Sequence, residues 1–168
     1  MTQQQTGNDQ LIIRCLNGPV EAEVCARMMS STEPWLTFGK SYEQALVIMN
    51  DPDLEVYIAT EGDGPLGFIV LALKGAFVGY VRTLCVRSES RSKGIGKRLL
   101  SFGEERIFQE SPNAFICVSS FNHQASELYL RLGYEVVGVL KDYVIAGSNE
   151  ILMRKSIASI SEFNRKPS

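Results

Sequence analysis

The segment VRTLCVRSESRSKGIGKRLL, residues 81–100, decides the fold of this chain. An apolar strand pattern runs into a polar stretch that holds Gly94 and Gly96, and a helical pattern follows. Such a strand–loop–helix unit presents unpaired backbone N–H groups and the positive end of a helix dipole at one point. Between Arg82 and Arg98 the chain also carries six basic residues and one acidic residue. The segment therefore favours an anion site, and phosphate suits it.

Two familiar phosphate motifs do not fit these residues. A Walker A loop requires a glycine five positions before Gly96, where Arg91 stands, and a serine or threonine at Arg98. A dinucleotide-binding fingerprint requires a third glycine, where the chain has Leu99. On pattern alone, a phosphate site and a structural turn with a basic surface both remain open.

Composition bounds the class of protein. With 168 residues, 45% of them hydrophobic, the chain fits one domain with one substantial core. A net charge of −2 argues against general binding to nucleic acid or to a membrane surface. Residues 1–10 lack the features of a signal peptide, so we expect a cytoplasmic protein. The four cysteines stand singly, which predicts buried, reduced thiols and no metal site.

On both sides of residues 81–100, the spacing of hydrophobic residues predicts an α/β fold. We expect a mixed, mostly antiparallel central sheet with helices on both faces and one parallel pairing, at the crossover of residues 78–120. We expect a polar N-terminal tail at 1–10, one domain at 11–156 and a C-terminal tail at 157–168. The predicted strands are 11–16, 56–60, 65–73, 77–86, 114–120, 134–142 and 149–155. The predicted helices are 20–30, 40–50, a helix from Lys93 to the break at ESPN, and a helix from Asn122 to Gly133.

Residues 81–100 resemble the acetyl-CoA-binding segment of the GNAT superfamily of N-acetyltransferases. That segment reads Arg or Gln, two residues, Gly, one residue, and Gly or Ala, and here Arg91, Gly94 and Gly96 fill the places. The stretch SSFNHQASELYLRLGYEVVG, residues 119–138, resembles the family's next motif. Its matching positions are Asn122, Ala125, Tyr129, Gly133, Tyr134 and Gly138. The resemblance spans 11–156 by element order and 78–139 at the level of motifs.

This resemblance implies an acetyltransferase (GNAT-like) fold in which the fourth and fifth strands splay apart. The anion is then the pyrophosphate of coenzyme A, acetyl-CoA is the co-substrate, and no metal is required. The backbone of the fourth strand would pair with the pantetheine arm as an added strand. The implied cofactor-binding residues are Leu84, Cys85, Val86, Arg91, Ser92, Lys93, Gly94, Ile95, Gly96, Lys97, Asn122, Ala125 and Tyr129.

The resemblance also implies chemistry, in which a primary amine attacks the thioester directly. In the family, the tyrosine at the place of Tyr129 points at the coenzyme sulfur, so Tyr129 would act as the catalytic acid. From residue spacing alone, Tyr129 would instead be a core aromatic residue. The base is open, because residues 79–86 and 115–120 hold no carboxylate. Tyr80, Glu150, His123 or a water chain could serve. A weak base favours acceptors of low pKa, such as an α-amine near 8 rather than a lysine near 10.4.

The acceptor side is expected in two segments. STEPWLTFGKSYE, residues 31–43, gathers aromatic side chains, which either bind substrate or pack in the core. LKDYVIAGSNEILMRK, residues 140–155, resembles the closing strands of ribosomal-protein N-terminal alanine acetyltransferases. The expected substrate-binding residues are Trp35, Phe38, Tyr80 and Tyr143. Protein N-terminal amines and small amines both remain open as acceptors, a homodimer is allowed, and a non-catalytic acyl-CoA-binding regulatory domain is the alternative function.

Overall fold

The computed structural model describes residues 10–62 and 64–164, and seven strands in this part of the chain form one sheet of order β1-β2-β3-β4-β5-β7-β6. The strands are β1 Ile12–Cys15, β2 Leu54–Thr60, β3 Pro65–Ala72, β4 Tyr80–Val86, β5 Asn113–Ser119, β6 Glu135–Leu140 and β7 Glu150–Ser156. The helices are α1 Gly18–Ser30, α2 Tyr42–Met49, α3 Ile95–Glu110, α4 His123–Arg131 and α5 Ile160–Phe163, with a 3₁₀ turn η1 at Ser88–Ser90.

The sheet is antiparallel except between β4 and β5, which run parallel. These two strands pair only where Tyr80 faces Phe115 and Val81 faces Ile116, and their later residues do not pair with each other. The expected mixed, mostly antiparallel sheet is therefore confirmed. An opening between β4 and β5 follows from the short pairing.

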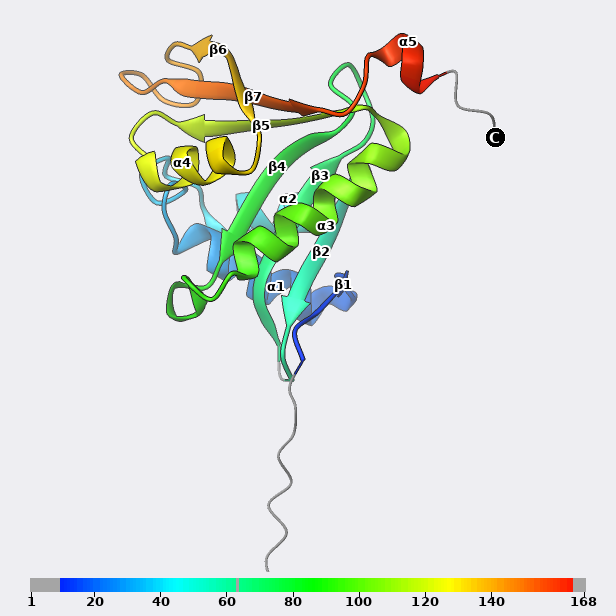
Figure 1. Ribbon diagram of the computed structural model, residues 1–168. Helices are drawn as coiled ribbons and strands as arrows, with labels where there is room; N and C mark the ends of the chain where they lie inside the picture. Colours follow the sequence, from blue (N-terminus) through cyan, green and yellow to red (C-terminus); the bar gives the residue numbers. More distant parts are fainter. Residues whose placement is uncertain (1–9, 63, 165–168) are drawn as a thin grey trace, which may run out of the picture.

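Helices cover both faces of the sheet, as Figure 1 shows, with α3 across one face of β2–β4 and α1 and α2 on the other. The central strand β3 accordingly reads as a continuous apolar run, and its residues from Phe68 to Leu71 are fully buried. Leu99, Leu100 and Ile107 of α3 pack on the first face, and Cys25 and Met29 of α1 belong to the core on the second. The sheet thus separates two apolar layers.

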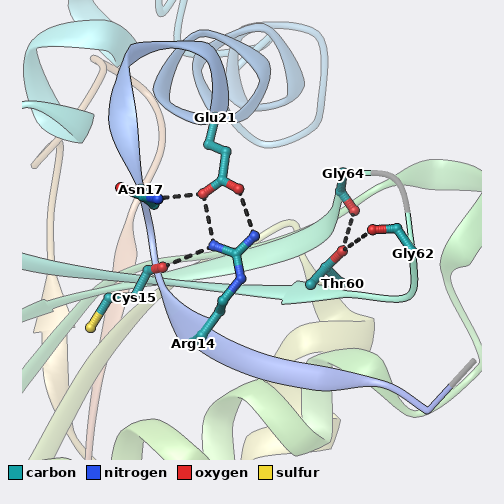
Figure 2. A network of polar contacts seen from close by, with 7 residues as sticks. All are labelled: Arg14, Cys15, Asn17, Glu21, Thr60, Gly62 and Gly64. Atoms are coloured by element: carbon teal, nitrogen blue, oxygen red, sulfur yellow. Dashed lines mark hydrogen bonds and ion pairs between the residues drawn. The ribbon is translucent and has the colours of Figure 1, made fainter.

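A bidentate ion pair joins the edge strand β1 to the first turn of α1 (Figure 2). The Arg14 guanidinium donates to both carboxylate oxygens of Glu21, at 2.6 and 3.0 Å, and the backbone N–H of Asn17 donates to the same carboxylate at 2.7 Å. The hydrogen bond from Arg14 lowers the pKa of Glu21. Because the pair is exposed, it orients the start of α1 more than it stabilises the fold.

The ends of the chain and its cysteines differ in part from expectation. Most of the expected N-terminal tail, residues 1–9, lies outside the described residues. Within the expected C-terminal tail, Ile160–Phe163 form the helical turn α5, which begins at a Ser159 capping box. Cys25 and Cys85 are buried as expected, and Cys117 is half-buried. Cys15 is exposed because the four-residue strand β1 lies at the sheet edge, so the expectation of a buried thiol is wrong there. No helix between residues 10 and 62 or 64 and 164 is long and apolar enough to span a membrane.

Candidate active site

The glycine loop lies at the start of α3, as the strand–loop–helix pattern requires. Gly94 is the N-cap residue and has a φ of +78°, a left-handed conformation that glycine adopts without strain. Arg98 donates the first hydrogen bond back into the turn, to the Gly94 carbonyl at 3.0 Å. Within the described residues, the backbone N–H groups of Ile95, Gly96 and Lys97 donate to no carbonyl or side chain. These donors and the dipole of the 16-residue helix α3 can bind an anion.

A cleft of about 890 Å³ begins at this loop and continues into the opening between β4 and β5. It brings together nearly all residues that the sequence predicts for the site. Those on its lining are Trp35, Phe38, Tyr80, Leu84, Cys85, Val86, Arg91, Ser92, Gly94, Ile95, Gly96, Lys97, Asn122, Ala125, Tyr129 and Tyr143. The two motifs, at residues 81–100 and 119–138, therefore face one cavity.

Lys93 is the exception among the predicted residues, because it does not line the cleft. The residue is exposed and stands next to Gly94. His123, one of the open candidates for a base, is also exposed and off the cleft. Glu150 and Tyr80, two other candidates, are on its lining. The described residues bring no three His, Cys, Asp or Glu side chains together in a metal-binding group.

Tyr129 reaches the cleft from α4, and only 7% of it is exposed. The helix begins at Asn122, whose side chain accepts the backbone N–H of Ala125 at 3.2 Å, and this cap fixes the first turn. The Tyr129 ring packs 5.8 Å from the ring of Tyr134. Burial raises the pKa of Tyr129 to about 12, so its hydroxyl keeps its proton at neutral pH. That hydroxyl makes no hydrogen bond with any residue of 10–62 or 64–164.

The opposite end of the cleft gathers polar side chains from three strands. Tyr80 starts β4, Cys117 lies on β5 and Glu150 starts β7, and all three line the cavity. Burial raises the pKa of Tyr80, and the nearby charges of Cys117, Tyr143 and Glu150 act in the same direction. Tyr143 projects from the loop between β6 and β7 and is 64% exposed. The Tyr80 phenol and the Cys117 thiol therefore stay neutral at this end of the cleft.

The loop between α1 and α2 forms a wall of the cleft. Phe38 packs edge-to-face on Phe121 at 6.1 Å, which joins this loop to the segment before α4. Trp35 both lines the cleft and packs against the core between α1, α2 and the sheet. The two readings of this aromatic residue, substrate surface and core, thus apply to different parts of one side chain.

Several lining residues were not predicted from the sequence. They include Glu33, Lys40, Arg82, Cys117, Ser119, Phe121, Gln124 and Arg131. All of them except Cys117 lie within stretches that the sequence analysis singled out, residues 31–43, 81–100 and 119–138. The stretches were therefore identified, but which of their side chains face the cavity depends on the folded chain.

A sheet that opens between two parallel strands, with a glycine loop that begins a helix at one end of the opening, is the architecture of an acetyltransferase. The chain belongs to the acetyltransferase (GNAT) family, whose model matches residues 22–134. It is similar to blasticidin-S acetyltransferase from Streptomyces morookaense, with 30% identity over 115 residues, 64% of this chain and 81% of that protein.

Two solved structures extend the comparison. Aminoglycoside 6′-acetyltransferase type Ii is 27% identical, with a TM-score of 0.73 over 88% of this chain and 98% of that one. An aminoglycoside 6′-N-acetyltransferase complexed with coenzyme A is 22% identical, with a TM-score of 0.71 over 94% of this chain and 99% of that one. The fold and the class of enzyme agree with the expectation from the sequence.

Proposed function

We propose that this acetyltransferase moves the acetyl group of acetyl-CoA to a primary amine by direct attack within the cleft. The observation that carries the proposal is the single cavity that holds both the glycine loop and Tyr129. The open N–H groups after Gly94 would bind the pyrophosphate, with Arg91, Ser92 and Lys97 around it. The backbone of Leu84, Cys85 and Val86, open on the β5 side, would pair with the pantetheine arm. A related fold complexed with coenzyme A supports this donor.

Within this proposal, the acceptor is a small-molecule amine rather than a protein N-terminus. Two relatives, which are 30% and 27% identical to the chain, are named for blasticidin S and for an aminoglycoside. Both of these compounds are small polar amines. The wall formed by Trp35 and Phe38 on one side and Tyr143 on the other would hold such an acceptor.

The test is release of free thiol from acetyl-CoA with three acceptors: blasticidin S, kanamycin as an aminoglycoside, and a peptide amide with an N-terminal alanine. We expect turnover with at least one of the first two, and the acetylated product in the mass spectrum. Faster turnover of the peptide would reassign the acceptor to a protein N-terminus. Coenzyme A binding without turnover of any acceptor would favour the alternative function, a non-catalytic regulatory domain.

A homodimer stays a prediction, which a measurement of the mass of the protein in solution tests.

Replacement of Gly96 tests the binding of the donor. In Gly96→Val, the added Cβ would stand 3.5 Å from the Val86 side chain, an ordinary contact, so the fold should be retained. The side chain would nevertheless occupy the cleft beside the open N–H groups. We expect coenzyme A to bind at least about tenfold more weakly, or about 1.4 kcal/mol, by calorimetry. Equal affinity in the folded variant would contradict a pyrophosphate site here.

Replacement of Trp35 tests the acceptor wall. Trp35→Ala should raise the acceptor KM several-fold and leave coenzyme A affinity unchanged, because Trp35 lies on the wall formed by the α1–α2 loop, away from the glycine loop. Part of the ring also packs in the core, so the melting temperature must be measured beside the kinetics. An unchanged KM with a lowered melting temperature would make Trp35 a core residue alone.

A further inference from the structure

Glu150 occupies the strand position from which a side chain can reach the open part of the sheet. It is the first residue of β7, between Ser119 of β5 and Leu140 of β6. Ser119 is the last residue of β5, well past the point where β5 leaves β4. The Glu150 side chain lines the cleft although the residue is only 5% exposed. A carboxylate therefore stands at the acceptor end of the opening, largely shielded from water.

This carboxylate lacks the partners that a buried charge normally has. Its Oε1 is buried and accepts no hydrogen bond within residues 10–62 and 64–164. No lysine, arginine or histidine in those ranges forms an ion pair with Glu150. Glu104, the other buried glutamate, is instead paired with Lys155 at 2.6 Å. Burial without a partner is costly, and such groups concentrate at functional sites.

The electrostatics of the neighbourhood fit a group that accepts a proton. Burial raises the pKa of Glu150, and the Ser119 hydroxyl partly opposes that effect. Burial raises the pKa of Tyr80 on β4 and of Cys117 on β5, and the charge of Glu150 adds to both increases. Leu140, its neighbour on β6, is apolar. Tyr80 and Cys117 are acids held in their protonated forms, so Glu150 is the group among the three that can take up a proton near neutral pH.

We infer that Glu150 is the general base that deprotonates the acceptor amine, an inference that rests on the proposed function. The acceptor enters as an ammonium ion, and the Glu150 carboxylate takes one proton from it. The nitrogen then attacks the thioester carbonyl carbon, a C–N bond forms, and the C–S bond breaks. The second proton of the nitrogen reaches the departing thiolate by way of the Tyr129 hydroxyl. The Glu150 proton passes to solvent, so the products are the amide, free coenzyme A and one proton.

The test compares Glu150→Gln with the wild type, using as probe the fastest of blasticidin S, kanamycin and the alanyl peptide amide. Glutamine keeps the shape and loses the base. We expect kcat/KM at pH 7 to fall at least tenfold, with unchanged coenzyme A affinity and no loss of thermal stability. Between the pKa of Glu150 and that of the amine, kcat/KM of the wild type should be flat. The variant requires amine that is already neutral, so its kcat/KM should rise about tenfold per pH unit.

The matched control is Glu135→Gln, the same chemical change at the first residue of β6, which is exposed and off the cleft. It should keep the flat wild-type profile. A flat profile for Glu150→Gln, or a rise in KM alone, would overturn the inference, because a carboxylate that only attracts the ammonium changes affinity and not the slope. Wild-type protein that acetylates none of the three probes would overturn the proposed function itself. Titration of ¹³C-labelled glutamate carboxyls by NMR adds a readout without turnover, and a Glu150 pKa near the ordinary 4.3 would contradict the role.

Discussion

Tyr129→Phe is expected to lower kcat about 100-fold while acetyl-CoA still binds with wild-type affinity. The hydroxyl lines the cleft and makes no hydrogen bond with a described residue, so its removal costs the fold no internal bond. The ring contact with Tyr134 is retained, because phenylalanine keeps the ring. Since the pKa of Tyr129 is about 12, the group is protonated throughout the working range and can donate to the departing thiolate.

Steady-state thiol release on the purified variant, with calorimetry for coenzyme A, measures this effect. An equal fall in kcat and kcat/KM would mark an interaction made in the transition state. Tyr134→Phe is the matched control, because it removes the hydroxyl of the neighbouring ring, which does not line the cleft. Activity of Tyr129→Phe within about twofold of wild type would return Tyr129 to the role of a core aromatic residue.

Gly79→Ala is expected to destabilise the fold by about 3 kcal/mol or more. Gly79 precedes β4 with a φ of +94°, and its carbonyl accepts the backbone N–H of Phe115 at 2.9 Å. A Cβ at this place would overlap the carbonyl oxygen of Asn113 and stand 2.7 Å from the Ile107 side chain. The junction between β4 and β5 has no room for this Cβ, so the backbone at residue 79 or at Asn113 would have to move.

Urea unfolding of the two proteins gives the difference in free energy. Gly75→Ala is a close control, with a φ of +91° and no atom within 4 Å of the added Cβ. It carries the backbone strain without the overlap, so we expect a loss of about 1 kcal/mol. A loss in Gly79→Ala no larger than that in Gly75→Ala would show that the junction yields easily.

The sequence predicted the elements well where the apolar pattern was unambiguous. The apolar run at 65–73 predicts a strand, and β3 covers Pro65–Ala72. Ile95, Leu99 and Phe102 at helical spacing predict a helix from Lys93, and α3 begins two residues later, at Ile95. Local chemistry dictates these features, so local sequence reveals them.

Features that depend on long-range register were harder to predict. Glu150 stood only among several candidates for a base, because its place opposite Ser119 depends on how β5 and β7 pair. The family resemblance grouped Lys93 with its neighbours, but Lys93 does not line the cleft. Trp35 could be assigned to core or to cleft from the sequence, whereas the folded chain gives it both contacts. Side-chain direction in loops has no periodicity from which to infer it.

Under the proposed function, the brief pairing of β4 with β5 would link the lifetime of this protein to the metabolic supply of its donor. A donor that pairs with β4 in the gap would complete the sheet, and it would bind only the folded chain. By mass action, a donor at about 100 times its dissociation constant adds about 2.7 kcal/mol to the free energy of unfolding. That increment is close to the loss expected for a damaged strand junction. Cells rich in acetyl donor would therefore keep even weakened copies folded, and starved cells would expose the same copies to proteolysis.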